Sequence, residues 1–394
     1  MKKLKVLIVH NQYQLAGGED TVAENEGNLL KEHGHEVFYY LRNNKEILKM
    51  NFLQKILSAV STIFSIKAYR DIRKIIKEHD IDVVHVHNTV PLISCSAYYA
   101  AKSLKCVLVQ SIHNMRMVCP SGMMIRNNRV CEDCLKKGLC CAIKNKCYKN
   151  SFFYSLLLTL SIALHRMIGS YDKVDAYLVT TEFNKKILQN VVNTDKIFIK
   201  PYYSDSEIRK LNDKKRSYYI YISRLEYLKG IQVALEAFKD MPDKKLLVLG
   251  VGPDEEKSRE FVRSHNLTNV EFLGFKNKNE MIELLYNAKA LVFPTQWYEG
   301  FPMTIVESLA VGTPIIGSNI GNVGTIVKHG ENGLLFDFDN PDDLVKKVNY
   351  LDDHPEIAVK LEEGAQDYFI KNNNPMSIYE FTVGLYKHLK SNLL

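Results

Sequence analysis

The chain has 394 residues, of which 46% are apolar and 25% charged, a balance typical of a globular protein whose length requires two domains rather than one core. Its charge is uneven: residues 1–200 carry 29 Lys and Arg against 17 Asp and Glu (+12), whereas residues 201–394 carry 23 against 28 (−5). The basic half predicts a polyanionic partner such as a membrane surface or a lipid phosphate, and the lack of a motif that reads RNA or DNA argues against nucleic acid.

The first predicted element is a buried strand, KVLIVH, at residues 5–10. Its apolar run is too short for the core of a signal peptide, so we expect a cytoplasmic protein whose eight cysteines are mostly thiols. The following loop contains Gly17 and Gly18, and a helix is expected from about Thr21. Because glycine lets the backbone approach a phosphate or sugar closely, this loop is a candidate ligand-facing turn.

Two stretches of the first half are candidates for contact with a membrane. Residues 52–78 combine helical apolar periodicity with a basic face, which predicts either a helix packed on a sheet or a membrane-surface helix. Residues 151–164 carry no charge but fall short of the roughly 20 residues that span a bilayer. They predict either a buried helix or an apolar surface that dips into lipid.

Histidines end two predicted parallel strands at residues 82–88 (DVVHVHN) and 106–116 (CVLVQSIHNMR). Ligand sites in doubly wound sheets collect at such carboxyl ends, where His85, His87 and His113 lie. A lone histidine is more often structural than functional, and His113 is the main functional candidate here.

The segment 119–147 contains six of the cysteines, including the C-x-x-C pair Cys131 and Cys134. Four thiolates, with Cys119 and Cys147 as the other two candidates, could form a structural zinc site that holds a long insertion together. The alternatives are a redox-active pair or free thiols without a joint role.

A polar linker is predicted at residues 201–216, and the second domain then opens with a strand and the loop RLEYLKG. Arg224 and Lys229 bracket this turn and could bind phosphate oxygens, Arg through its planar fork and Lys as a point charge. The alternative is two ordinary surface cations. A further strand at residues 270–275 ends in Gly274 and Phe275.

The stretch 289–316 predicts a strand, a turn and a helix that begins after Pro302. Free backbone N–H groups at Met303, Thr304 and Ile305 would make the helix start an anion site suited to phosphate. Glu299 precedes the turn and Glu307 lies one helical turn further on. The alternative is an ordinary strand–turn–helix with exposed acids.

Glu299 and Glu307, with seven residues between them, resemble the paired glutamates of the GT-B glycosyltransferases of retaining family four. The resemblance extends over nearly the whole chain and implies an α/β fold with two Rossmann-like, doubly wound parallel-sheet domains and an interdomain cleft. Residues 1–200 would then bind the acceptor, residues 201–376 the nucleotide sugar, and a last helix at 377–390 would pack back on the first domain.

The resemblance also implies roles for individual residues. Glu299 and His113 would contact the donor sugar, and Glu307 would bind the ribose. Arg224 and Lys229 would bind the pyrophosphate. The expected catalytic residues are His113, Glu299, Arg224 and Lys229. The rest of the expected donor site comprises the Gly-Gly loop, the end of strand 270–275 and the turn before the 303 helix: Gly17, Gly18, Gly274, Phe275, Gly300, Phe301, Met303, Thr304 and Ile305.

The expected activity is transfer of a hexose from a nucleotide diphosphate sugar, with retention of configuration and without a required metal or cofactor. The expected acceptor is a saccharide or a polyprenyl-linked saccharide of cell-surface polysaccharide synthesis. The enzyme is expected to attach peripherally to the inner membrane, where it would bind this acceptor. A nucleotide-sugar epimerase and a non-catalytic nucleotide-sugar sensor are the alternatives. The intact set of Arg224, Lys229, Glu299 and Glu307 argues against a sensor.

Overall fold

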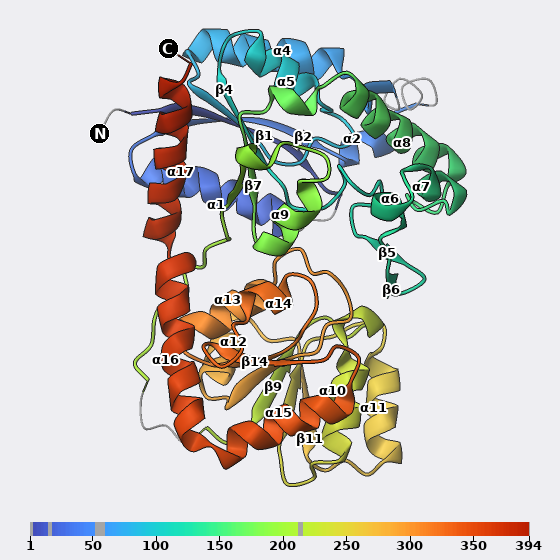
Figure 1. Ribbon diagram of the computed structural model, residues 1–394, viewed down its shortest axis with the longest axis vertical. Helices are drawn as coiled ribbons and strands as arrows, with labels where there is room; N and C mark the ends of the chain where they lie inside the picture. The colour runs from blue at the N-terminus through green and yellow to red at the C-terminus, as the bar shows by residue number, and fades with distance from the viewer. Residues whose placement is uncertain (1–2, 15–17, 52–59, 212–215, 394) are drawn as a thin grey trace. The chain divides into compact units, whose positions relative to one another are not determined.

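A computed structural model describes residues 3–14, 18–51, 60–211 and 216–393. Gly17 and residues 52–59 of the predicted basic helix lie outside this range. The chain divides into two compact units: unit 1 comprises Met1–Met124, Cys131–Pro201 and Ile378–Leu394, and unit 2 comprises Ile125–Val130 and Tyr202–Ser377. Each unit contains one six-stranded sheet with helices on its faces, so the prediction of two parallel α/β sheets is confirmed (Figure 1).

The sheet of unit 1 has the strand order β2-β1-β3-β4-β7-β8, and neighbouring strands pair in parallel throughout its described residues. Its central strands are buried along their whole length, as expected for a sheet covered on both faces. The order reverses between β1 and β3, which marks the topological switch point. The strands are β1 (Lys5–Gln12), β2 (Glu36–Asn43), β3 (Val83–Val86), β4 (Val107–Ser111), β7 (Ala176–Val179) and β8 (Ile197–Ile199).

The helices of unit 1 precede and follow these strands and include a short pair in the cysteine-rich insertion. They are α1 (Gly18–Glu32), α2 (Lys45–Leu48), α4 (Ile66–His79), α5 (Ser96–Lys102), α6 (Asp133–Lys136), α7 (Cys140–Lys144), α8 (Phe152–Met167) and α9 (Glu182–Leu188). A two-stranded hairpin, β5 (Ile125–Arg126) with β6 (Arg129–Val130), interrupts this series.

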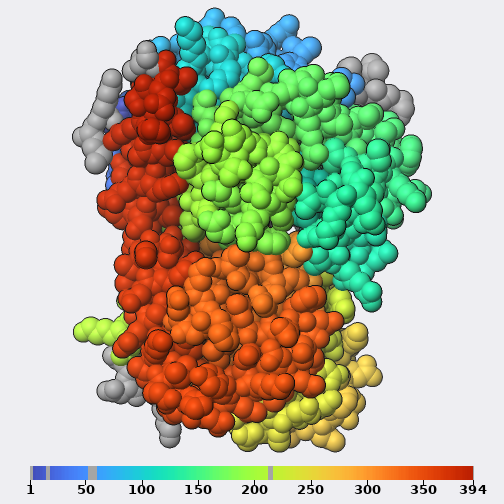
Figure 2. All heavy atoms as spheres, in the orientation of Figure 1, coloured from blue at the N-terminus to red at the C-terminus, as the bar shows by residue number. Residues whose placement is uncertain are grey.

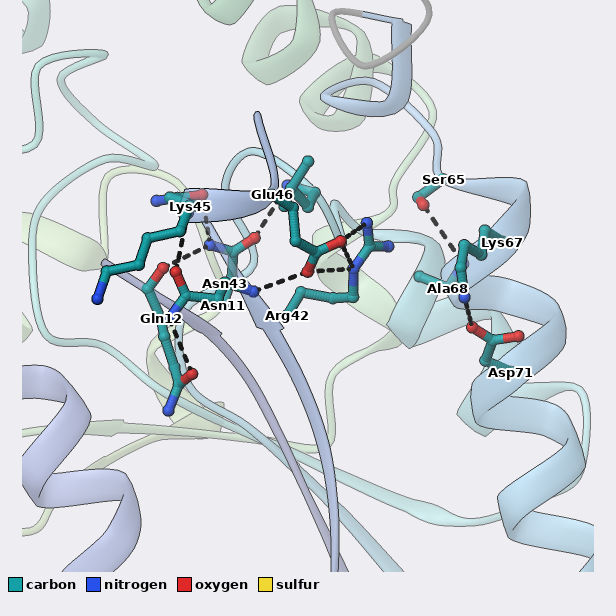
Figure 3. A network of polar contacts seen from close by, with 12 residues as sticks. Asn11, Gln12, Arg42, Asn43, Lys45, Glu46, Ser65, Lys67, Ala68 and Asp71 are labelled. Carbon is teal, nitrogen blue, oxygen red and sulfur yellow. Dashed lines mark hydrogen bonds and ion pairs between the residues drawn. The ribbon is translucent and has the colours of Figure 1, made fainter. Parts of the chain in front are cut away.

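The prediction of one continuous helix over residues 52–78 is wrong in its described part, because Val60 and Ser61 are helical, residues 62–65 are not, and α4 begins at Ile66. The Ser65 side chain caps this helix by accepting the backbone N–H of Ala68, as Figure 3 shows. The residues just before it are held by other groups: the Ser161 hydroxyl donates to the Thr62 carbonyl, and His165 Nε2 lies 2.8 Å from the Ile63 carbonyl oxygen. Tertiary hydrogen bonds therefore override the helical periodicity of this stretch.

The last helix, α17 (Pro375–Ser391), passes from unit 2 into unit 1. Its Tyr379 hydroxyl lies 3.0 Å from His35 Nε2, and Lys390 forms an ion pair with Asp82. Tyr386 is fully buried, with its hydroxyl 2.6 Å from His85 Nδ1. The C-terminal residues thus complete the core of unit 1.

The sheet of unit 2 has the order β11-β10-β9-β12-β13-β14, which is the 3-2-1-4-5-6 order of the dinucleotide-binding fold. Its switch point lies between β9 and β12. The strands are β9 (Tyr219–Ile222), β10 (Leu246–Leu249), β11 (Val270–Gly274), β12 (Ala290–Phe293), β13 (Ile315–Ser318) and β14 (Gly333–Phe336).

Two apolar layers form the core of unit 2, because successive strand residues point to opposite faces of the sheet. Tyr219 and Tyr221 face one layer, and Ile220 and Ile222 face the other. The helices are α10 (Ile231–Lys239), α11 (Glu255–Ser264), α12 (Lys278–Tyr286), α13 (Met303–Ala310), α14 (Val323–Ile326), α15 (Pro341–Asp353) and α16 (Pro355–Asn372).

Candidate active site

The switch point of unit 2 brings Lys229 and Glu299 together. Lys229 follows β9 and Glu299 follows β12, and the Lys229 ammonium donates to both oxygens of the Glu299 carboxylate at 2.8 and 2.9 Å. Glu299 Oε1 also accepts from the indole N–H of Trp297 at 2.9 Å and from the Thr295 hydroxyl at 3.0 Å. Three side chains thus donate hydrogen bonds to this buried carboxylate.

A close backbone approach holds this pair in place. Gly230 ends the turn after β9 with φ +74°, and a Cβ atom there would lie 1.7 Å from the carbonyl oxygen of Pro294. Only glycine fits both the left-handed conformation and the contact. On the other side, the Asn322 side-chain amide donates to the carbonyls of Glu299 and Gly300 at 2.5 and 2.6 Å.

The helix α13 begins beside Glu299 with Pro302 as its N-cap. Met303 and Thr304 occupy the first turn, where backbone N–H groups have no acceptor within the helix. The prediction of a third free N–H at Ile305 is wrong, because that group donates to the Pro302 carbonyl at 3.0 Å. Glu307 is half-buried, and loss of hydration raises its pKa although Lys278 partly opposes the shift.

The other predicted donor-site residues of unit 2 lie at the strand ends but are more exposed. The Arg224 side chain is 67% exposed, with its Nε 3.6 Å from Glu226. Gly274 ends β11 with φ +66°, and Phe275 after it is 77% exposed. The structure therefore places an exposed cation and an exposed aromatic ring at the same carboxyl edge of the sheet as Lys229.

In unit 1, His113 follows β4, and its Nε2 lies 2.9 Å from His87 Nδ1. Burial lowers the pKa of His113 to about 4, so its imidazole is neutral at pH 7. Gly18 is the first residue of α1, so that helix begins three residues earlier than predicted. The adjacent Glu19 accepts from the Asn114 amide at 2.8 Å and thereby ties the start of α1 to the loop that carries His113.

Two of the hollows in the described part of unit 1 lie near the carboxyl ends of its strands. One of about 80 Å³ lies next to His113 and is bordered by Asn88, Gln110 and Arg116 among others. A larger one of about 520 Å³ lies along α1 and the ends of β1 and β2, where Gln12 and Asn43 form part of its wall. Figure 3 shows these two side chains beside Asn11 and Lys45 in one polar network.

The cysteine-rich insertion brings Cys119 and Cys134 into direct contact. The hydrogen bond from Cys134 lowers the pKa of Cys119 to about 5, and the backbone N–H groups of Ser121 and Met124 also bond to the Cys119 sulfur. The same contact raises the pKa of Cys134, to which Cys147 and Cys141 add further negative charge. The other two cysteines of the predicted set, Cys131 and Cys147, are both partly exposed.

Sequence reasoning missed several residues of these sites, most clearly Glu26 and Lys200. Lys200 Nζ lies 2.5 Å from Glu26 Oε1, and both side chains are buried in unit 1. A signal was available, because Glu26 occupies the inward face of α1 together with Ala23 and Leu30. A carboxylate at a core position of an amphipathic helix indicates a buried partner.

Comparison with known proteins agrees with this architecture. Residues 16–201 match the family described as Glycosyltransferase Family 4, and residues 204–368 match Glycosyl transferases group 1. An uncharacterized glycosyltransferase of Methanocaldococcus jannaschii is 24% identical over 93% of both chains. The Campylobacter jejuni N,N'-diacetylbacillosaminyl-diphospho-undecaprenol alpha-1,3-N-acetylgalactosaminyltransferase is 28% identical over 44% of this chain and 46% of its own.

Solved structures show the same fold. An Anabaena protein crystallised in complex with UDP has a TM-score of 0.66 to this chain at 14% identity, and the match covers 98% of this chain and 100% of that one. The two family matches meet at the boundary between the units and together cover every strand of the two six-stranded sheets except β1. The chain belongs to the group 1 and family 4 glycosyltransferases, enzymes of the GT-B fold that transfer a sugar from a nucleotide sugar.

Proposed function

We propose that this enzyme transfers a hexose from a nucleoside diphosphate sugar to a lipid-linked saccharide, with retention of configuration, in the synthesis of a cell-surface polysaccharide. The observation that carries the proposal is the Lys229–Glu299 pair at the switch point of unit 2, beside the N-terminus of α13. A cation and a helix N-terminus at this edge suit a diphosphate, and a hydrogen-bonded carboxylate suits sugar hydroxyls.

In this mechanism, negative charge grows on the leaving diphosphate as the sugar becomes oxocarbenium-like. An ammonium group has three N–H donors, and Lys229 directs two of them at Glu299, which leaves the third for a phosphate oxygen. The exposed Arg224 and the amides of Met303 and Thr304 supply further neutralising groups. Glu299 positions the sugar, Glu307 binds the ribose, and the leaving phosphate accepts the acceptor proton in a front-face attack.

Unit 1 is the proposed acceptor domain. Its 520 Å³ hollow is lined by polar side chains, Gln12, Tyr13 and Asn43 among them, which suit a saccharide. The name of the Campylobacter relative states that it acts on a diphospho-undecaprenol-linked sugar, which supports a lipid-linked acceptor.

A membrane-facing surface is proposed on α8. Phe153, Leu160 and Met167 recur every seven residues on its outer side and are 59%, 53% and 78% exposed. In Figure 2 the green atoms of this segment lie at the surface of unit 1. Three lysines, Lys144, Lys146 and Lys149, precede the helix. These exposed apolar side chains and the lysines before them support peripheral attachment. Among the described residues, none of the helices is long and apolar enough to cross a bilayer.

The function is tested by incubating the enzyme with a panel of nucleotide sugars, with and without a membrane lipid extract. We expect one donor to be consumed rapidly only when lipid is present, with the sugar appearing on lipid and its anomeric configuration retained. Conversion of a nucleotide sugar without any acceptor would indicate an epimerase. Binding without turnover in either arm would indicate a sensor.

We also propose that the cysteine insertion binds one structural zinc ion. The Cys119–Cys134 contact and the two amides directed at Cys119 suit a metal-bound thiolate. Among the described residues no three cysteines place their sulfurs within 4.8 Å of one another, so Cys131, Cys141 or Cys147 would have to move toward the pair to complete the site. Protein purified under reducing conditions should contain about one zinc per chain.

In the same metal analysis, Cys134→Ser should lose the zinc, and Cys140→Ser, which changes an exposed thiol, should keep it. Wild-type protein that is free of metal and titrates as eight thiols would contradict the proposal.

A further inference from the structure

Arg116, in the loop that follows β4, is a partly buried cation without a counterion. Its backbone N–H donates to the Asn114 side chain at 3.2 Å. Its guanidinium forms no ion pair with a carboxylate among the described residues, and its Nε is buried without a hydrogen-bond partner there. A Cβ atom at Gly122 would lie 3.5 Å from Nε and Nη2, so the backbone packs against the group. Buried donors normally have acceptors, so a guanidinium left without one indicates an anionic ligand.

Glu19 is the one carboxylate described on the wall of the adjacent 80 Å³ hollow, and other groups hold it. Its Oε2 accepts from the Tyr13 hydroxyl at 2.8 Å, and its Oε1 accepts from the Asn114 amide at 2.8 Å. Burial and Glu19 raise the pKa of Tyr13, and Arg116 opposes the shift, so the Tyr13 hydroxyl lies near both charged groups. Because neutral donors hold Glu19, the positive charge of Arg116 remains available to an anion from outside the protein.

A second cation, Lys149, shares the ring of Tyr148 with Arg116. The guanidinium carbon of Arg116 lies 5.7 Å from the centre of this ring, and Lys149 Nζ lies 5.8 Å from it. The ring attracts each cation, but the two cations repel one another, and neither has a carboxylate in an ion pair among the described residues. An anion that contacts both cations would remove this repulsion.

The two cations lie between a polar hollow and an apolar helix end, all within unit 1. Tyr13, near Arg116, is part of the wall of the 520 Å³ hollow that suits a saccharide. Lys149 Nζ lies 5.3 Å from the ring centre of Tyr154 in α8, where the neighbouring side chains of Phe152 and Phe153 are exposed. The order of the groups is therefore polar hollow, cations and exposed apolar side chains. A lipid diphosphate that carries a saccharide has the matching order of saccharide, anion and hydrocarbon.

We propose that Arg116 and Lys149 bind the diphosphate of the lipid-linked acceptor, with its saccharide directed into the hollow bordered by Tyr13 and its hydrocarbon chain toward α8. The planar fork of arginine donates two parallel hydrogen bonds to phosphate oxygens, and lysine adds a point charge. The identity of the acceptor rests on the proposed function, whereas the affinity of unit 1 for a lipid diphosphate does not.

The first test is calorimetric titration of the full-length enzyme with a short prenyl diphosphate, the matching monophosphate and the uncharged alcohol. The affinity should be highest for the diphosphate and lowest for the alcohol. Arg116→Gln should weaken diphosphate binding about 10-fold or more, because charge-assisted hydrogen bonds are lost. Lys149→Gln should weaken it about threefold, because this side chain is exposed. The control is Lys173→Gln, which removes a cation 4.9 Å from the ring centre of Tyr99 in the same unit and should leave binding unchanged.

The donor site also suits a diphosphate, so the titration is repeated with Lys229→Ala. The prenyl diphosphate should bind this variant as tightly as the wild type, and a loss of binding would place the ligand in unit 2 and overturn the proposal. Equal affinity for the diphosphate and the alcohol, or undiminished diphosphate binding by Arg116→Gln, would also overturn it. If Arg116→Gln fails to fold, undiminished binding by Lys149→Gln has the same meaning, because its exposed side chain can be changed without disturbing the core.

Two further measurements identify the source of the phosphate. Arg116→Gln should float with anionic phospholipid vesicles as the wild type does, and a loss of flotation would identify bilayer headgroups as the ligand and overturn the assignment to the acceptor. In transfer to a lipid-linked acceptor, Arg116→Gln should raise KM for the acceptor about 10-fold and leave KM for the donor unchanged. Diphosphate binding through Arg116, combined with transfer to soluble saccharides alone, would keep the site and overturn the proposed lipid-linked acceptor.

Discussion

Replacing Lys229 with alanine should lower sugar transfer at least about 100-fold, the usual effect of removing one preorganised group that stabilises an anion in the transition state. Two losses combine in this variant. The leaving diphosphate loses a cation, and the Glu299 carboxylate loses the partner that contacts both of its oxygens. Glu299 would keep Trp297 and Thr295 as donors, so the loop should remain folded while the sugar-positioning geometry relaxes. The measurement is kcat/KM for transfer, with circular dichroism to verify folding.

The matched control is Lys245→Ala. Lys245 also makes a 2.8 Å ion pair, with Glu271, but both side chains are about half exposed. Lys245 directly precedes β10 and therefore lies at the end of the parallel strands opposite to the carboxyl edge that carries Lys229. Exposed pairs contribute little, so we expect less than a twofold change in transfer. Near-normal turnover of a folded Lys229→Ala enzyme would remove the Lys229 ammonium from the mechanism.

Arg224→Ala should also reduce transfer about 100-fold or more, because the exposed guanidinium is expected to close on the diphosphate.

Changing Phe153, Leu160 and Met167 together to aspartate should release the enzyme from anionic vesicles. Burying each such side chain contributes about 1.5–3 kcal/mol, so losing three of them should reduce vesicle binding far more than 10-fold. The wild-type protein should float with anionic vesicles, less with neutral ones, and less at high salt because the lysines before α8 are screened. Flotation at two salt concentrations measures this.

The control is Val359→Asp, which changes an apolar side chain of unit 2 that is 56% exposed and should not affect flotation.

Changing the basic residues of α4 to glutamine should reduce vesicle binding less than the α8 variant does. Lys67 pairs with Asp71 and Lys74 with Glu78, which neutralises much of that face. Equal binding of the wild type and the α8 variant would show that α8 is merely a solvent-exposed helix and would direct attention to a soluble acceptor.

Much of the fold was predictable because parallel strands are short apolar runs that end in polar or glycine-containing turns. The strand at 82–88 and the turn before α13 both follow this rule. The sequence could not show which distant charges would meet. Lys229 and Glu299 are brought together by the strand order, which places β9 beside β12. Glu26 on α1 and Lys200 after β8 meet although they are 174 positions apart. The break before α4 was equally hidden, because it depends on hydrogen bonds from α8 and not on local propensity.

The position of α17 has a consequence for synthesis on the ribosome. Tyr379, Tyr386 and Lys390 complete unit 1, yet they are translated after every residue of unit 2. Domains usually fold in the order in which they emerge, N-terminal first. When translation reaches Ser377, all residues of unit 2 have been synthesised, but unit 1 still lacks the part of α17 that packs on it. A nascent chain halted anywhere between residues 202 and 377 therefore exposes the apolar surface that buried Tyr386 later covers, and it is a natural substrate for chaperones.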